Sequence, residues 1–272
     1  MATRLDAAFA AAREQRRTGL VTFVMAGDPD LRRSEQVLLA LDRAGSDVVE
    51  VGVPFSDPVA DGPVIQRASE RALAAGTTLD RVLALCSAVR PRMRAPLVLF
   101  TYLNPVLRLG VARFVEQAAG AGVDGLLVVD LPLEESGRLR DAAGAAGMDR
   151  INLVSPTTSQ PRISQAASMG SGFLYAISTL GVTGARQALG GEARRLVERI
   201  RRETAMPVAV GFGISHPDQV REVGHWADAA VVGSSIVNLV AGCAGREDLG
   251  DRVEAHVRWL LGRAPAESTG EP

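Results

Sequence analysis

Lysine is absent from the 272 residues, and every basic side chain other than histidine is an arginine. Schiff-base chemistry on carbonyl substrates and the covalent attachment of pyridoxal phosphate both require a lysine amine. The chain itself therefore uses neither. Histidine is also scarce: His216, His225 and His256 lie late in the sequence, without the close spacing that is typical of zinc ligands. We expect no bound metal.

Cysteine is nearly absent as well, since only Cys86 and Cys243 occur and they lie far apart. Both fall in helical contexts, which favours structural thiols in a reducing, cytoplasmic compartment. No apolar run reaches the roughly 18–20 residues of a membrane helix. The net charge of −1 and the pI of about 6.3 show no basic surface of the kind that binds nucleic acid or anionic lipid.

Residues 1–17 are rich in alanine and arginine, so a transit peptide is an alternative to a structural helix. Two acidic residues, Asp6 and Glu14, argue against the transit peptide. Leu5, Ala8, Phe9 and Ala12 share one helical face. We expect an N-terminal helix that docks on the rest of the protein, and a disordered tail over residues 264–272.

Eight short apolar segments alternate along the chain with longer segments of helical periodicity. Continuous hydrophobicity is typical of strands that are buried on both faces of a parallel sheet. The expected strands are Leu20–Met25, Asp47–Val51, Pro96–Thr101, Gly125–Val129, Arg150–Val154, Phe173–Ile177, Pro207–Val210 and Ala229–Val232. The expected helices include Ser34–Ala44, Leu79–Val89, Val111–Ala119, Glu134–Ala146, Arg162–Met169, Ala193–Glu203, Asp218–Val223, a short helix from Ser234, and Asp248–Leu261.

Eight such units predict an α/β fold: a single (β/α)8 TIM barrel over residues 1–272, with an extra N-terminal helix and additional short helices in the βα loops. A doubly wound sheet is the competing architecture. Two strand-to-helix connections, Gly52–Pro63 and Ser178–Gly191, exceed the usual length of about 2–6 residues. Long loops at the carboxyl ends of barrel strands carry function, so a site is expected there.

One carboxyl group lies just before the first of these loops and another lies near its end. Glu50 lies at the end of an apolar strand, where burial favours the neutral acid and raises the pKa, so it suits proton transfer near neutrality. A core glutamate paired with an arginine is the alternative. Asp61 lies eleven residues later in a loop stiffened by Pro58 and Pro63, and a turn aspartate that caps the next helix is its alternative role.

Glycine-rich turns follow the last three expected strands: GVTG (Gly181–Gly184), GFGIS (Gly211–Ser215) and VGSSIV (Val232–Val237). Exposed backbone N–H groups in such turns, together with a helix N-terminus, bind phosphate in many barrels. The pair of turns after strands seven and eight therefore predicts a phosphorylated ligand. The alternative is that these glycines only make tight turns.

The motifs taken in order resemble the tryptophan synthase alpha subunit family along nearly the whole chain. They are AGDPD (Ala26–Asp30), the block from Glu50 to Pro63, TYLNP (Thr101–Pro105), GVDGLLVVDLP (Gly122–Pro132), SPTTS (Ser155–Ser159) and the three glycine-rich turns. The resemblance implies three catalytic residues: Glu50, Asp61 and Tyr175. It implies phosphate binding by Gly184, Gly213, Gly233 and Ser234. It implies an indole pocket and lid made by Phe23, Leu127, Phe212 and Thr183, and a β-subunit interface that includes Asp57, Pro58 and Asn104.

The resemblance also implies the reaction and the partner. The reaction would be retro-aldol cleavage of indole-3-glycerol phosphate to indole and glyceraldehyde 3-phosphate. A β subunit that carries pyridoxal phosphate would receive the indole in an α2β2 tetramer, and this chain would need no cofactor of its own. Alternatives are a stand-alone lyase that releases indole, another phosphosugar barrel such as an isomerase, and a non-catalytic regulator of a β subunit. Val129, Leu133 and Leu180 depart from the family's pattern beside the site.

Overall fold

The computed structural model describes residues 2–177, 186–211 and 213–263. The expected tail over residues 264–272 lies outside these ranges. Nine parallel strands form one sheet in the order β5-β4-β3-β2-β1-β9-β8-β7-β6. They are β1 (Gly19–Met25), β2 (Val48–Gly52), β3 (Leu97–Thr101), β4 (Gly125–Val128), β5 (Asp149–Arg150), β6 (Asn152–Val154), β7 (Leu174–Ile177), β8 (Val208–Gly211) and β9 (Ala229–Val232).

The two edges of this sheet meet, because β5 and β6 are successive pieces of one stretch of chain. β5 pairs with β4, β6 pairs with β7, and only Ile151 separates the two pieces. The Ile151 N–H donates to the carbonyl oxygen of Leu126 at 2.9 Å, which continues the pairing with β4. The predicted (β/α)8 barrel is thereby confirmed, with the expected fifth strand divided in two.

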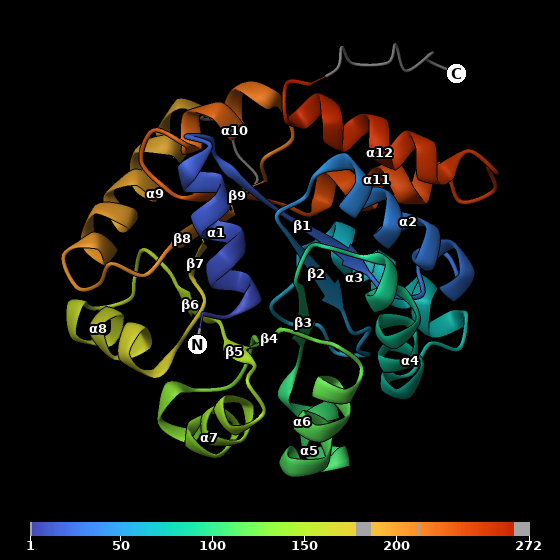
Figure 1. The fold of residues 1–272 in the computed structure, drawn as a ribbon, viewed down its shortest axis with the longest axis horizontal. Helices are drawn as coiled ribbons and strands as arrows, with labels where there is room; N and C mark the ends of the chain where they lie inside the picture. Colours follow the sequence, from blue (N-terminus) through green and yellow to red (C-terminus); the bar gives the residue numbers. More distant parts are fainter. Residues whose placement is uncertain (1, 178–185, 212, 264–272) are drawn as a thin grey trace.

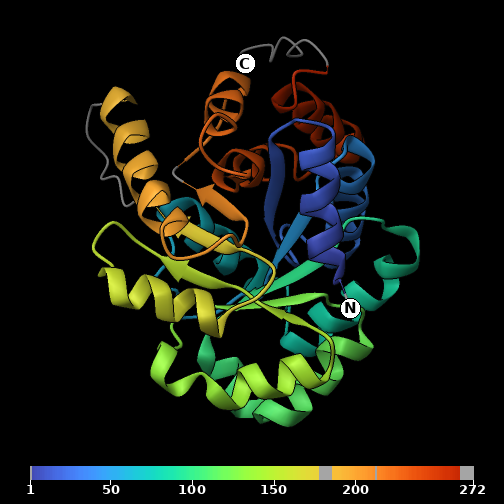
Figure 2. The same cartoon turned by 60° about the vertical axis from the view of Figure 1, so that its left-hand side comes forward.

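Helices surround the barrel, as Figures 1 and 2 show. The helices are α1 (Arg4–Glu14), α2 (Leu31–Ala44), α3 (Pro63–Ala74), α4 (Leu79–Val89), α5 (Leu103–Leu109), α6 (Val111–Gly120), α7 (Gly137–Ala145), α8 (Gln160–Met169), α9 (Arg186–Arg201), α10 (Pro217–Val223), α11 (Ser234–Gly242) and α12 (Leu249–Leu260), with 3-10 turns η1 (Arg90–Arg92) and η2 (Leu133–Glu135). The main apolar core lies between the sheet and these helices. Within the described ranges no single helix has the length and apolar composition of a membrane span, although the bent pair Pro63–Ala74 and Leu79–Arg92 meets both criteria together.

Several expected boundaries differ from the observed ones, including the three that follow. α9 begins at Arg186, seven residues before the predicted start, because a helix tolerates the paired glycines that the sequence reading took for loop. The expected helix from Glu134 is divided into η2 and α7, and the Ser136 hydroxyl donates to the Leu133 carbonyl at 2.6 Å between them. β2 is shifted by one residue, so Glu50 occupies its middle and not its end.

α1 lies in front of the barrel strands in Figure 1 and closes that end of the barrel. Leu5 and Phe9 are buried in the cluster that fills the barrel interior, together with Val21, Val98 and Phe173. The rings of Phe9 and Phe173 are 5.3 Å apart. The predicted docking of the N-terminal helix is confirmed, and the transit-peptide alternative gains no support from this packing.

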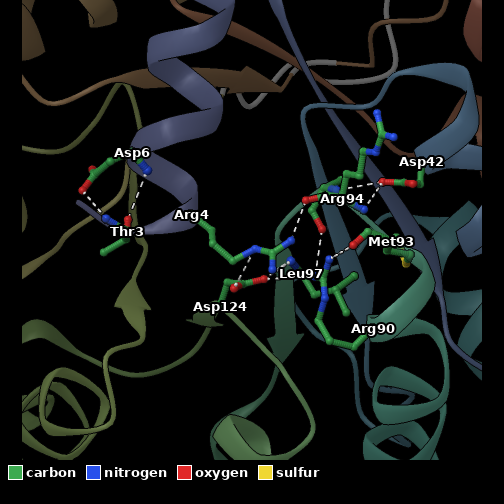
Figure 3. A network of polar contacts seen from close by, with 10 residues as sticks. Thr3, Arg4, Asp6, Asp42, Arg90, Met93, Arg94, Leu97 and Asp124 are labelled. Carbon is green, nitrogen blue, oxygen red and sulfur yellow. Dashed lines mark hydrogen bonds and ion pairs between the residues drawn. The ribbon is translucent and has the colours of Figure 1, made fainter. Parts of the chain in front are cut away.

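Polar contacts fasten the start of α1 to the loops at the same end of the barrel (Figure 3). The Arg4 guanidinium donates to the Arg94 carbonyl at 2.6 Å and lies 3.4 Å from the Asp124 carboxylate. Asp124 also accepts from the Leu97 N–H at 2.8 Å and pairs with Arg90 at 3.3 Å. With this end of the barrel closed, a ligand site belongs at the other mouth.

Shortening Phe9 to alanine is expected to destabilise the fold by about 3 kcal/mol, since it removes most of a buried aromatic side chain and leaves a cavity. Urea unfolding followed by circular dichroism measures this change. Glu14→Gln, on the exposed side of the same helix, is the matched control and should change stability by less than about 0.5 kcal/mol. Equal stability of the Phe9→Ala and unaltered chains would show that α1 is not part of the core.

Candidate active site

A cavity of about 470 Å³ opens at the carboxyl ends of the strands and gathers residues from most of the chain. Its polar and glycine lining comprises Glu50, Asp61, Gly62, Tyr175, Gly211, Gly213, Gly233 and Ser234. Its apolar lining comprises Phe23, Ala60, Ile65, Phe100, Val129, Leu153, Ile177 and Val231. A larger hollow of about 580 Å³ between α1, α10 and α12 is lined by arginines and contains no carboxyl pair. We therefore place the site in the smaller cavity.

Glu50 points into the barrel from the middle of β2, in register with Phe23 of β1 and Val98 of β3. The side chain is completely buried, and neither carboxyl oxygen has a hydrogen-bond partner among the described residues. Burial raises the pKa of Glu50 to about 8, so the neutral acid predominates at pH 7. Among the described residues no arginine pairs with Glu50, so the alternative of a core glutamate–arginine pair is not supported. A buried, unpartnered carboxyl on a cavity wall is typical of a group that acts on a ligand.

Asp61 belongs to the connection between β2 and α3, where its own N–H donates to the Pro58 carbonyl at 3.0 Å. Burial raises the pKa of Asp61 to about 6, and a hydrogen bond with Tyr102 partly offsets this rise. The residue that caps α3 is Gly62, without a side-chain hydrogen bond, so Asp61 does not have the capping role that was its alternative. Asp61 lines the cavity, so a ligand there can reach its carboxyl group.

The two carboxyl groups differ in charge at pH 7 because their surroundings shift their pKa values by different amounts. Glu50, with a pKa of about 8, keeps its proton, whereas Asp61, with a pKa of about 6, is mostly ionised. Two carboxyl groups held in different protonation states can serve as proton donor and as hydrogen-bond acceptor in one reaction. The cavity thus combines acid and anion on an otherwise apolar wall.

Tyr175 lies on β7, and its ring fits the barrel because β8 carries glycine beside it. A Cβ atom on Gly211 would lie 2.7 Å from the Tyr175 hydroxyl oxygen, closer than real side chains approach. The first glycine of GFGIS therefore makes room for this tyrosine. Burial, and then the charges of Glu50 and Asp61, hold the pKa of Tyr175 well above its ordinary value, so its phenol remains a hydrogen-bond donor.

Tyr102 belongs to the TYLNP motif, and the sequence pattern by itself predicts no role for it. Its hydroxyl oxygen accepts a hydrogen bond from the Ala60 N–H at 3.1 Å, and its ring stacks on Phe55 with centroids 5.0 Å apart. These contacts hold the loop at Phe55 and at Ala60, the residue directly before Asp61. The motif was the only available signal, because nothing local in the sequence shows that the loop folds back onto the end of β3.

The part of the cavity that is formed by the turns after β8 and β9 has features of an anion site. Gly213 adopts a φ of +81°, which favours glycine, and has open space where a side chain would be. Gly233 precedes α11, which begins with Ser234 and has no side-chain cap. The first N–H groups of an α-helix lack intrahelical acceptors, so an anion can accept from them. All three residues line the same cavity as Glu50.

The structure places the other residues implied by the resemblance, and those that depart from the family's pattern, as follows. Phe23 and the departing residue Val129 line the cavity, but Leu127 does not: it is completely buried in the interior cluster that includes α1. Thr183, Gly184, Phe212 and Leu180 lie outside the described residues. Asp57 and Asn104 are exposed, Pro58 is partly buried, and Leu133 is partly buried at the start of η2.

Among the described residues, no group of three or more histidine, cysteine or acidic side chains is arranged to hold a metal ion.

Fold and site together define the chain as a (β/α)8-barrel protein with an acid–base cavity at the carboxyl ends of its strands. A model of the family described as "Tryptophan synthase alpha chain" matches residues 9–260. The tryptophan synthase alpha chain of Synechococcus elongatus is 52% identical over 237 residues, which cover 87% of this chain and 89% of that protein. The Geobacter sp. protein of the same name is 49% identical over 262 residues, which cover 95% and 98%. The chain belongs to the tryptophan synthase alpha chain family, and is thus a subunit of an enzyme of tryptophan biosynthesis.

Solved structures agree with this assignment. Tryptophan synthase from Mycobacterium tuberculosis has a chain that is 35% identical to this one, with a TM-score of 0.88 and coverage of 98% of this chain and 100% of that chain. The tryptophan synthase subunit alpha from Legionella pneumophila is 33% identical, with a TM-score of 0.87 and coverage of 95% and 97%. The similarity extends over the whole barrel and is not confined to the motifs.

Proposed function

We propose that this chain cleaves indole-3-glycerol phosphate to indole and glyceraldehyde 3-phosphate by a retro-aldol reaction. The observation that carries the proposal is the carboxyl pair in one cavity, with Glu50 neutral and Asp61 mostly ionised at pH 7. The family assignment supports the same reaction. An aldol cleavage needs a group that takes up the electrons of the broken bond, and a chain without lysine has no amine for an iminium.

The indole ring supplies that electron acceptor once its C3 atom is protonated. Glu50 donates its proton to C3, which turns the ring into an indolenine with positive charge near nitrogen. The Glu50 carboxylate then removes the proton of the C3′ hydroxyl group. The C3–C3′ bond breaks, its electron pair restores the aromatic indole, and the oxygen-bearing carbon becomes the aldehyde of glyceraldehyde 3-phosphate. Glu50 ends the cycle protonated, so the reaction needs no outside proton.

The Asp61 carboxylate accepts a hydrogen bond from the indole N–H and stabilises the positive charge that develops on the ring. Phe23, Phe100 and Leu153 on the apolar wall enclose the ring itself. The phosphate group accepts hydrogen bonds from the turns at Gly213, Gly233 and Ser234, and we assign Gly184 and the lid residue Thr183 to the same ligand from the family's pattern. The uncapped start of α11 supports this end of the assignment.

A β subunit that binds pyridoxal phosphate is the proposed partner and receiver of the indole, within an α2β2 assembly. Asp57, Pro58 and Asn104 would face it. Two exposed apolar side chains near these residues support this interface: Val59 is 85% exposed and Leu107 is 59% exposed. Exposed apolar groups of this kind are typical of protein interfaces. A stand-alone lyase that releases indole is the alternative, because the chemical site would be the same.

Indole production from indole-3-glycerol phosphate, titrated with a β subunit, tests both points. We expect slow release by the purified chain and a rise as the β subunit is added, because an interface at the Asp61 loop would order the site. Glu50→Gln with the same β subunit is the control for cleavage by contaminants. Full-rate release without the β subunit would favour the stand-alone lyase. No release under either condition would refute the cleavage reaction.

A further inference from the structure

α12 carries two aromatic side chains, His256 and Trp259, that lie behind the turns assigned to phosphate. The Nε2 atom of His256 is 2.8 Å from the hydroxyl oxygen of Ser235. Ser235 directly follows Ser234 in the first turn of α11, so this hydrogen bond joins α12 to the helix start that lines the cavity.

Two ring contacts connect His256 to the turn after β8. The rings of His256 and Trp259 are 5.4 Å apart at an interplanar angle of 37°, and the ring of Trp259 meets that of His216 edge-on at 5.2 Å and 85°. His216 is the cap residue of α10 and ends the turn that contains Gly213. The four side chains therefore join the turn after β8 to the turn after β9 through α12, none of whose residues lines the cavity.

We propose that Ser235, His256, Trp259 and His216 form a support that fixes the two phosphate-accepting turns relative to each other, so that His256 and Trp259 are positioning residues for the substrate's phosphate. This inference rests on the proposed function, since it assigns a supporting structure to the same anion site. None of these four side chains lines the cavity.

Such a support matters because the proposed anion site consists largely of backbone N–H groups. Hydrogen bonds to an anion weaken steeply when donor and acceptor are misaligned. Gly213 has a φ that favours glycine and, lacking a side chain, has no side-chain packing to hold its backbone N–H in place. A turn that is ordered before the ligand arrives binds it with a smaller loss of conformational entropy.

The remainder of the turn after β8 is held from within the chain. The N–H groups of Ser215 and His216 both donate to Oε1 of Gln219, at 2.8 and 3.0 Å. This shared acceptor fixes the turn to α10, and the Trp259 contact fixes α10's cap residue to α12. Burial lowers the pKa of His256, so the Ser235–His256 hydrogen bond joins two neutral groups at pH 7. His256 therefore contributes through the geometry of this hydrogen bond and not through a positive charge.

Two single variants and their combination test the inference. Ser235→Ala removes the hydroxyl partner with little change in volume, and His256→Phe removes the ring nitrogen but keeps an aromatic ring beside Trp259. A hydrogen bond of this kind contributes about 1 kcal/mol, so each change should raise the KM for indole-3-glycerol phosphate about 3- to 10-fold. The inhibition constant of inorganic phosphate should rise by the same factor. We expect kcat, and the dissociation constant of indole alone, to change by less than about 2-fold in the same variants.

The double variant should resemble either single variant, because both changes remove the same bond. His225→Gln is the matched control, because this exposed histidine lines the arginine-lined hollow and not the cavity that contains Glu50. Unchanged phosphate inhibition in both single variants would overturn this inference but would leave the proposed phosphate site intact. So would an equal weakening of indole binding, which would indicate general damage to the barrel. If phosphate does not inhibit the unaltered chain, both the inference and the proposed phosphate site are wrong.

Discussion

Glu50→Gln is expected to lower the rate of indole release by at least about 100-fold while the barrel stays folded. Glutamine keeps the size of the side chain and its place between Phe23 and Val98, but it can neither donate a proton to indole C3 nor remove one from the C3′ hydroxyl. Single-turnover indole formation, with the β subunit present and substrate in excess of KM, measures the effect. Glu70→Gln, at an exposed position of α3, is the control for the substitution itself. Near-normal turnover in Glu50→Gln would remove this residue from the mechanism.

The same substitution is expected to stabilise the folded chain in a pH-dependent way. In the folded state the pKa of Glu50 is about 8, whereas the ordinary value is 4.5. Between these two pH values the unfolded chain loses a proton that the folded chain keeps, so the stability contributed by Glu50 is complete below pH 4.5 and is lost as the pH rises toward 8. Glutamine does not titrate and does not lose this stability.

The advantage of Glu50→Gln should therefore be small near pH 4.5 and grow to the order of 3 kcal/mol at pH 7. Urea unfolding of both chains at several pH values measures it. A stability difference that does not vary with pH would show that the carboxyl group is not desolvated in the folded chain. Activity and stability then change in opposite directions at one residue, because the burial that makes Glu50 an acid at neutral pH also destabilises its charged form.

Asp61→Asn is the second change with a large expected effect, again a loss of at least about 100-fold in turnover. Asparagine has the same shape but no negative charge, so it no longer stabilises the protonated indolenine. The pH profile gives a second readout. The unaltered chain should show a bell-shaped profile of kcat/KM, with a lower limb near pH 6 and an upper limb near pH 8.

Asp61→Asn should lose the limb near pH 6 and keep the limb near pH 8. Asp141→Asn, at an exposed position of α7, should retain both limbs and full turnover. A variant at position 61 that still loses activity below pH 6 would assign that limb to another group, and undiminished turnover would exclude Asp61 from charge stabilisation.

Local sequence patterns predicted most strands well because these are short runs of apolar residues, many of them β-branched. Glu50 is the one carboxyl among the valines of β2, and the divided fifth strand, with Asp149, Arg150 and Asn152, is more polar than the others. The patterns predicted less well wherever a boundary depended on packing. The paired glycines Gly190 and Gly191 were interpreted as loop but belong to α9, since helix propensity is a weak effect that neighbouring packing overrides. The division of the fifth strand at Ile151 arises where the chain changes partners from β4 to β7, which no local pattern encodes.

Some features of the candidate site were likewise predictable from local sequence, and others were not. A lone carboxyl in an apolar strand already indicated that burial would raise the pKa of Glu50, and motif order alone indicated the family. The absence of lysine excluded iminium chemistry before any coordinate was known. These conclusions depend on residue identity and on neighbours within a few positions, which the linear chain contains in full.

Contacts between distant parts of the chain required the folded barrel. Gly211 leaves space for Tyr175, Tyr102 holds the segment that carries Asp61, and His256 reaches Ser235 across 21 residues. The protonation states of Glu50 and Asp61 at pH 7 likewise depend on how many atoms of other strands exclude water from each carboxyl group. Desolvation and close approach are properties of three-dimensional neighbours, and closing the barrel is what makes these residues neighbours.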